Sequence, residues 1–116
     1  MHVLIIEDEN MIAMHVQEYM RDLGFESFSI ASGQDEAIEV ALQRRPDLII
    51  ADFQLEQGTG PEAVKQICKD WLIPTIYVAA LPWEVRAADP RAVILEKPFL
   101  GPELLGAVRD ALAQAQ

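Results

Sequence analysis

The stretch VLIIEDE at residues 3–9 decides the fold class of this chain of 116 residues. Four aliphatic residues in a row, followed at once by three acids, predict a short strand that is buried on both faces. A second stretch, LIIAD at residues 48–52, has the same form and ends at Asp52. Strands of this kind are typical of parallel sheets that carry helices on both sides, so the two stretches favour an α/β fold.

Segments with helical periodicity lie between such apolar runs along the chain. Residues 10–23 place Ile12, Val16 and Met20 on one stripe and end before Gly24, which is typical of an amphipathic helix. Strand and helix alternate five times, which predicts a five-stranded parallel sheet with helices on both faces. The predicted strands are 3–6, 25–31, 48–51, 74–80 and 92–95.

Single residues predict how several helices begin and end. Ser32 is expected to cap the second helix, and Pro61 is expected to begin the third, at whose end Trp71 should cover the core. Residues 81–91 leave room for only a short or irregular fourth helix, because Pro90 cannot continue it. The last helix is expected to open at Gly101.

The balance of charges argues against one class of partner. The chain has 19 acids and 9 bases, which gives a formal net charge of −10. Such a surface repels phosphate backbones, so we expect no direct binding of nucleic acid. It attracts cations and basic partners instead.

Length and cysteine content predict one domain in a reducing compartment. The length suits a single core, so we expect one domain over residues 1–116. Cys68 is the one cysteine, which excludes an intrachain disulfide. No apolar run approaches the roughly 20 residues that span a bilayer, and the N-terminus lacks the basic region of a signal peptide. We therefore expect a cytoplasmic protein without membrane contact.

Charged residues follow the predicted strands at the points where these strands end. Glu7 and Asp8 follow the first strand, Asp52 the third and Lys97 the fifth. Ligands of parallel α/β sheets bind beyond the carboxyl ends of the strands, so we expect these four side chains to meet at one edge. Each of them taken singly is typical of an ordinary surface residue, and their convergence carries the functional interpretation.

Three carboxylates at one edge require a positive charge beside them. Like charges raise the pKa of neighbouring carboxyl groups and destabilise the fold unless something neutralises them. Mg²⁺ suits this position, because it binds oxygen ligands and often shares them with phosphate oxygens. Asp52 could then attack phosphorus as a nucleophile, while the metal ion and Lys97 neutralise the transferred group.

The chain resembles the receiver domains of two-component response regulators over its whole length. The motifs that carry the resemblance are IIEDE at 5–9, DLIIAD at 47–52 and EKPF at 96–99, with glycines at 58 and 60 in the intervening loop. The resemblance implies a CheY-like sheet with the strand order 2-1-3-4-5. It also implies that Asp52 accepts a phosphoryl group from a histidine kinase or a histidine phosphotransfer protein.

The resemblance further assigns roles around Asp52. It implies that Mg²⁺ is bound by Asp8 and Asp52 directly, by Glu7 through water and by the backbone carbonyl of Gln54. It implies that Lys97 contacts the phosphoryl group. The backbone N–H groups that face this group would be those of Ala79 and Ala80.

Two residues depart from the pattern of the family. Ala79 stands where receivers usually carry Thr or Ser, and Ile94 stands where they usually carry Tyr or Phe. The segment from Ala79 to Lys97 is also shorter than usual. In these features the chain is similar to an atypical receiver subfamily that is linked to general stress responses and has a degenerate fourth helix. The usual switching mechanism is therefore not expected to operate here.

Three other functions fit parts of the pattern. A receiver fold could serve as a phosphorylation-independent docking module, as Ala79 and Ile94 suggest. A phosphatase with an aspartyl nucleophile would need a second Asp where Gln54 stands, and a flavodoxin-type nucleotide site would be repelled by the acids at 7–9. We therefore expect a signalling switch that acts on a downstream protein as a monomer or weak dimer, and not a metabolic enzyme.

Four residues outside this edge have simpler interpretations. Cys68 is expected to be a small buried hydrophobe. His2 and His15 have no companions at the spacing of metal ligands, so they are expected on the surface or at an edge of the fold. Trp83 lies in a segment with little helix to bury it, which leaves partner contact and partial burial both open.

Overall fold

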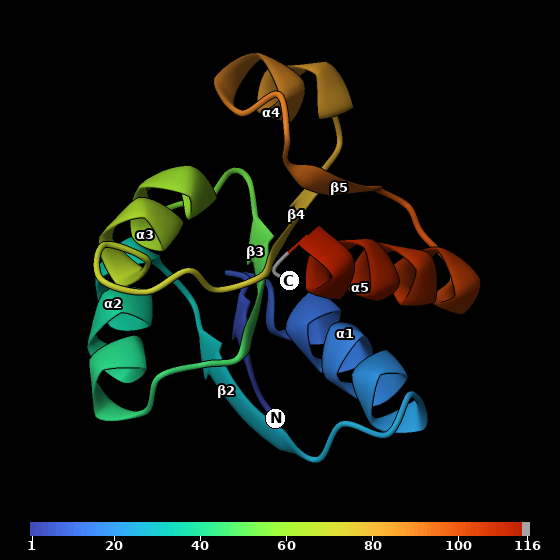
Figure 1. Ribbon diagram of the computed structural model, residues 1–116, viewed down its shortest axis with the longest axis horizontal. Helices are drawn as coiled ribbons and strands as arrows, with labels where there is room; N and C mark the ends of the chain where they lie inside the picture. Colours follow the sequence, from blue (N-terminus) through green and yellow to red (C-terminus); the bar gives the residue numbers. More distant parts are fainter. Residues whose placement is uncertain (115–116) are drawn as a thin grey trace.

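Five parallel strands form one sheet in the order β2-β1-β3-β4-β5 (Figure 1). The computed structural model describes residues 1–114. This order is the one predicted from the sequence. The strands are β1 (His2–Ile6), β2 (Ser27–Ala31), β3 (Leu48–Asp52), β4 (Thr75–Ala79) and β5 (Val93–Glu96).

Helices cover both faces of the sheet. In Figure 1 α1 and α5 lie together on one side, α2 and α3 lie together on the other, and α4 stands at the top. The five helices are α1 (Asn10–Asp22), α2 (Gln34–Gln43), α3 (Gly60–Ile67), α4 (Pro82–Ala88) and α5 (Gly101–Gln114). The fourth helix has 7 residues, so the prediction of a short helix is confirmed.

Two hydrophobic clusters share the side chains of the central strands. Val3 and Ile5 of β1 pack with residues of α1 and α5, whereas Leu4 and Ile6 pack with residues of α2 and α3. Because successive side chains of a strand point to opposite faces, a strand covered on both sides needs an uninterrupted apolar run. This explains why all five residues of β1 and all five of β3 are buried.

Two predictions at the ends of helices are wrong. The N-cap of α2 is Gly33 and not Ser32, whose own backbone N–H donates to the carboxylate of Glu36 at 2.8 Å. Trp71 lies beyond α3, is 49% exposed and stacks under the guanidinium of Arg45, with 5.0 Å from Cζ to the ring centroid. The backbone N–H of Ser32 and the ring of Trp71 thus have charged partners that a hydrophobic pattern does not indicate.

The prediction that His2 lies on the surface or at an edge is also wrong. His2 is 4% exposed, and its two ring nitrogens lie 2.7 Å from the hydroxyl oxygens of Ser27 and Ser29 on β2. Its backbone N–H donates to the carboxylate of Asp47 at 2.7 Å. Hydrogen bonds at both ring nitrogens make this burial tolerable. His15, in contrast, is exposed, as expected.

Candidate functional site

The predicted charged residues meet at the carboxyl ends of three strands. Asp52 is the last residue of β3, Glu7 and Asp8 directly follow β1, and Lys97 directly follows β5. Their positions result from strands that run side by side in parallel, with β1 paired to β3 and β3 paired to β4. The sheet therefore brings together side chains that lie up to 90 positions apart in the chain.

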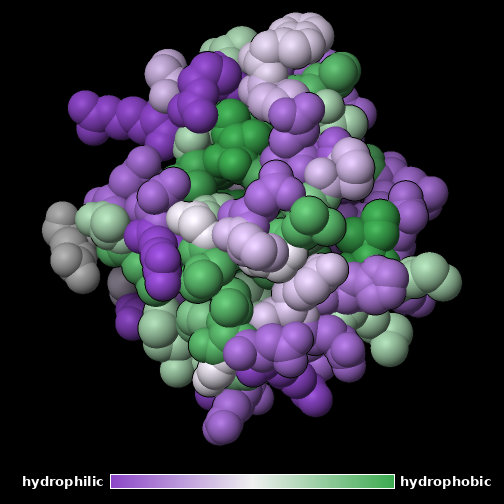
Figure 2. Space-filling view, turned by 90° about the vertical axis from the view of Figure 1, so that its right-hand side faces the viewer, coloured by the Kyte–Doolittle hydropathy of each residue, from purple (hydrophilic) through white to green (hydrophobic). Residues whose placement is uncertain are grey.

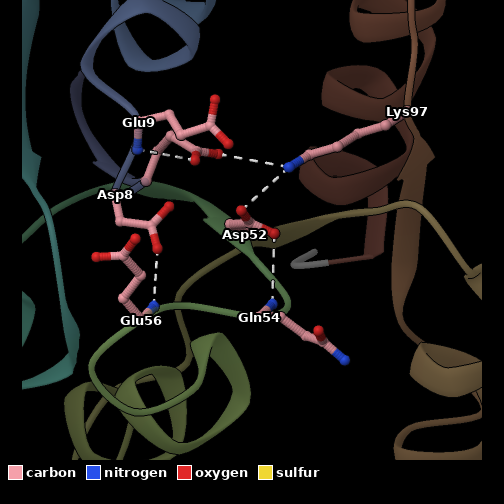
Figure 3. Close-up of polar contacts among 7 residues, drawn as sticks. Asp8, Glu9, Asp52, Gln54, Glu56 and Lys97 are labelled. Carbon is pink, nitrogen blue, oxygen red and sulfur yellow. Dashed lines mark hydrogen bonds and ion pairs between the residues drawn. The ribbon is translucent and has the colours of Figure 1, made fainter.

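The three acids are close enough to share one small ligand. One carboxylate oxygen from each of Glu7, Asp8 and Asp52 lies within 4.8 Å of the others. The Nζ atom of Lys97 reaches Asp52 Oδ2 at 3.1 Å, as Figure 3 shows, and Glu7 Oε2 at 3.8 Å. Lys97 is the one cation among the described residues that line this part of the fold.

Backbone N–H groups fix the direction of each carboxylate. Gln54 N–H donates to Asp52 Oδ1 at 3.3 Å, and Glu56 N–H donates to Asp8 Oδ2 at 2.7 Å (Figure 3). Glu9 N–H donates to Glu7 Oε1 at 3.1 Å. The orientation of the three carboxylates is thus fixed by backbone groups of the loops that follow β1 and β3.

Burial and repulsion act on the charge of Glu7. The pKa of Glu7 is raised to about 8, chiefly by burial. The hydrogen bond from Glu9 N–H opposes this rise, the charge of Asp52 adds to it, and Lys97 lowers the pKa to a smaller extent. For Lys97, burial lowers the pKa, but the hydrogen bond and charge of Asp52, together with Glu7, outweigh it and raise the pKa overall. In the metal-free protein Glu7 is therefore mostly protonated at neutral pH, while Lys97 stays charged.

The loop between β3 and α3 is tightly closed behind Asp52. Gln54 and Thr59 form an isolated antiparallel bridge, and Gly60 N–H donates to the carbonyl of Phe53 at 3.2 Å. A Cβ at Gly60 would collide with the carbonyl oxygen of Asp52, so this position requires glycine. Gly58 has a φ of +81°, which also favours glycine.

An open cleft of about 400 Å³ lies over the acids. Asp8, Asp52 and Lys97 line one part of it. Ala79 and Ala80, at the end of β4, line another part, so they lie where a group bound to Asp52 would meet the chain. Gln54 also lines the cleft, and Glu7 lies directly beside it, close to Asp52 and Lys97, so the structure brings all of the predicted site residues to one place.

The donor set fits a hard divalent cation. Carboxylate oxygens within 4.8 Å of one another are the kind of ligand that Mg²⁺ binds. Burial disfavours the charged form of Glu7, as its raised pKa indicates, and a bound cation would offset this cost. Asp8, Asp52 and the carbonyl of Gln54 are the groups that could hold the ion, with Glu7 behind them.

Sequence reasoning missed the acid that α4 adds to the cleft. Glu84 lines the cleft, and its Oε2 accepts a hydrogen bond from Gln54 Nε2 at 3.1 Å. Nothing in the local pattern of residues 81–91 distinguishes Glu84 from a solvated helical acid. The signal would have been the shortness of α4, which leaves its first turn beside the β3–α3 loop.

A family model for the response regulator receiver domain matches residues 3–109. The chain belongs to this family. Receivers are the regulated domains of two-component systems, and the motifs at 5–9, 47–52 and 96–99 lie at the described edge of the sheet.

Two curated receiver proteins are similar over nearly the whole chain. The phyllosphere-induced regulator PhyR of Methylorubrum extorquens is 33% identical over 114 residues, which are 95% of this chain and 43% of PhyR. The transcriptional regulatory protein PdtaR of Mycobacterium tuberculosis is 33% identical over 116 residues, which are 97% of this chain and 57% of PdtaR. The chain thus spans about half the length of these relatives.

Solved receiver structures superimpose closely on the fold. The response regulator PhyR from Brucella abortus has a TM-score of 0.88 at 32% identity, with 97% of this chain and 48% of that chain covered. The PhyR receiver domain of Erythrobacter litoralis has a TM-score of 0.87 at 30% identity, with 97% and 89% covered. A chemotaxis protein CheY4 from Vibrio cholerae has a TM-score of 0.83 at 25% identity, covering 95% of this chain and 97% of its own, which supports the CheY-like topology.

This receiver lacks both side chains of the relay expected in such domains, which pairs a Thr or Ser at position 79 with a Tyr or Phe at position 94. Ala79 is buried at the end of β4, and Ile94 is a half-buried aliphatic residue on β5. Within residues 1–114, no helix combines the length and the apolar character that crossing a bilayer requires.

Proposed function

We propose that this receiver is a phosphoacceptor switch in which Asp52 takes a phosphoryl group from a phosphohistidine on a histidine kinase or phosphotransfer protein. The observation that carries the proposal is the position of Asp52, in contact with Lys97 at 3.1 Å and surrounded by Glu7 and Asp8. The transfer depends on Mg²⁺. The domain catalyses changes in its own phosphorylation and is not a metabolic enzyme.

Asp52 acts as the nucleophile. One carboxylate oxygen attacks phosphorus, the P–N bond of the phosphohistidine breaks, and the imidazole keeps the electron pair and takes up a proton. Lys97, whose raised pKa keeps it protonated, neutralises an oxygen of the phosphoryl group. Ala79 and Ala80 at the end of β4 line the same cleft, and their backbone N–H groups would serve as further donors.

The metal ion supplies the positive charge that the acids and the phosphoryl oxygens require. Asp8, Asp52 and the backbone carbonyl of Gln54 would hold it directly, and Glu7 would act through water. Glu56 N–H keeps Asp8 directed into the cleft, and Gln54 N–H does the same for Asp52.

The partner that donates the phosphoryl group docks beside α1. An apolar hollow next to the cleft is lined by Ile12, His15, Tyr19, Pro98 and Phe99, and Met14 of α1 is 63% exposed. Figure 2 shows hydrophobic residues gathered among hydrophilic ones on the face that carries the end of α1 and the start of α5. A partner seated there would bring its histidine close to Asp52.

The phosphorylated domain acts on a downstream protein. PhyR from Bartonella quintana is described as an anti-anti-sigma factor, and that protein is 32% identical to this chain. By this likeness, the output here is protein binding and not direct contact with nucleic acid, which the net charge of −10 disfavours. We also propose a cytoplasmic location and a monomer or weak dimer.

A phosphorylation-independent docking module is the second candidate, because Ala79 and Ile94 replace the hydroxyl and aromatic side chains with which receivers usually respond to phosphorylation. Incubation with phosphoramidate, a small P–N donor, separates the two functions. The phosphoacceptor predicts an acyl-phosphate signal in the phosphorus NMR spectrum with Mg²⁺ and none with EDTA. A docking module predicts no such signal in either condition.

A further inference from the structure

Gln54 contacts two separate parts of the molecule. Its backbone N–H donates to Asp52 Oδ1 at 3.3 Å, while its side-chain Nε2 donates to Glu84 Oε2 at 3.1 Å. Glu84 lies in the first turn of α4. One residue thus connects the proposed phosphoacceptor with the fourth helix.

The backbone of Gln54 has little freedom of its own. The bridge to Thr59 holds it from one side, and the preceding residue, Phe53, donates its N–H to the carbonyl of Val78 at 2.9 Å. Gly60, in contact with the carbonyl of Asp52, closes the loop. Because the loop is held at these points, we infer that modification of the Asp52 carboxylate affects Gln54 directly and is not taken up by movement of the loop.

Few other contacts hold α4 to the domain. Of its residues, all of which the structure describes, Val85 is buried. Its N-cap, Leu81, makes no side-chain capping bond, and Arg86 bonds to the carbonyl of Pro90 within the same segment. In Figure 1 α4 stands apart from the other helices. Beside the packing of Val85 in the core, the exposed Gln54–Glu84 hydrogen bond is thus a side-chain contact that attaches the first turn of α4 to the β3–α3 loop.

Glu84 also faces the charge that phosphorylation would add. It lines the same cleft as Asp52, together with Asp8, Glu9 and Glu56. A phosphoryl group on Asp52 brings additional negative oxygens into this cleft, and like charges repel each other. The repulsion acts on Glu84, whose partner Gln54 is bonded to the modified side chain.

We propose that Gln54 is a positioning residue that couples the state of Asp52 to α4, with Glu84 as its partner. Phosphorylation weakens the Gln54–Glu84 hydrogen bond and releases the first turn of α4. The pair thereby replaces the relay that Ala79 and Ile94 cannot form. The proposal rests on the phosphoacceptor function proposed above and names the route of its output.

Amide hydrogen exchange of residues 85–88 tests the attachment in the metal-free protein. Glu84→Ala removes the acceptor, so exchange there should become roughly fivefold faster, as expected for the loss of one net hydrogen bond. Glu84→Gln keeps an acceptor oxygen and should exchange like the wild type, as should the control Glu39→Ala on α2. Equal exchange in the wild type and Glu84→Ala would overturn the proposal.

A beryllofluoride mimic with Mg²⁺ tests the coupling. Fluorine NMR reports whether the mimic is bound, and its absence from the site would overturn the phosphoacceptor function itself. With the mimic bound, exchange at 85–88 should rise severalfold in the wild type and Trp83 fluorescence should change, with less than half of both effects in Glu84→Gln. A bound mimic that leaves 85–88 unchanged, or an undiminished response in Glu84→Gln, would overturn the coupling and leave the phosphoacceptor function intact.

Discussion

Glu7 is the residue whose charge destabilises the metal-free fold. Its folded pKa is raised above that of an unfolded glutamate, first by burial, so the unfolded chain releases this proton at lower pH. The contribution of Glu7 to the free energy of unfolding is fully present below about pH 4.5 and is lost as the pH rises towards about 8.

Glu7→Gln should therefore stabilise the metal-free protein at pH 7.5. We expect a gain of about 1–2 kcal/mol in the free energy of unfolding, since one pKa unit corresponds to about 1.4 kcal/mol. Urea unfolding measures it. The control Glu39→Gln, at an exposed position of α2, should change the free energy little. A lower stability of Glu7→Gln would contradict the assigned cost of burying the Glu7 charge.

His2 should make stability depend on pH in the opposite direction. Burial chiefly, and then Arg44, lower the pKa of His2 below its usual 6.5. As the pH falls, the unfolded chain therefore takes up this proton before the folded chain does. The contribution of His2 to the free energy of unfolding is fully present above about pH 6.5 and is lost as the pH falls below it. We expect His2→Gln to cost more stability at pH 7 than at pH 5. An equal cost at both values would mean that the His2 ring titrates as in the unfolded chain.

Single residues differ in how far the sequence predicts them. Asp52 and Lys97 were predictable because each follows an apolar strand, and parallel strands end at one edge. The role of His2 was not, because its burial depends on Ser27 and Ser29 of a different strand. The prediction that Trp71 covers the core failed for a similar reason, because its partner Arg45 follows a different helix, α2.

At the scale of elements, α4 carries the proposed output without the relay of other receivers. Ala79→Thr adds a hydroxyl beside the cleft, but Ile94 has no ring to turn and few χ1 choices. We therefore expect this variant to keep the wild-type change in Trp83 fluorescence on binding beryllofluoride. A change twice as large in Ala79→Thr alone would mean that the hydroxyl acts without the aromatic partner.

The exposed side of α1 is the proposed docking surface. Met14→Glu should slow phosphoryl transfer from a phosphohistidine protein by about tenfold or more, because it places a charge on the exposed apolar part of α1. Transfer from acetyl phosphate should change less than twofold. Leu42→Glu on α2, where Leu42 is 79% exposed, is the matched control. Equal slowing with both donors would place the damage in the cleft or the fold.

The elements themselves were predicted well, and their ends less so. Apolar runs and helical stripes reflect burial, which the fold satisfies on both faces of the sheet. The prediction that Ser32 caps α2 failed because the helix begins one residue later, after Gly33, and Ser32 is bonded to Glu36 only through its backbone N–H. The Gln54–Glu84 hydrogen bond joins side chains 30 positions apart, so no local pattern could indicate it.

At the scale of the whole molecule, stability and function draw on the same acids. Magnesium that binds the folded state should raise the melting temperature by mass action. We expect millimolar Mg²⁺ to raise it by several degrees in the wild type and by much less in Asp8→Asn, whose metal-free form should itself be more stable. A melting temperature of the wild type that does not change with Mg²⁺ would contradict the proposed metal site.

Intact-mass spectrometry after incubation with Mg²⁺ and acetyl phosphate tests the central claim, phosphorylation of Asp52, most directly. The account predicts one added phosphoryl group in the wild type and in the control Asp70→Asn, whose exposed side chain lies beyond α3. It predicts none in Asp52→Asn or in the wild type with EDTA. Labelling of Asp52→Asn at the wild-type rate, or an unlabelled wild type, would contradict it.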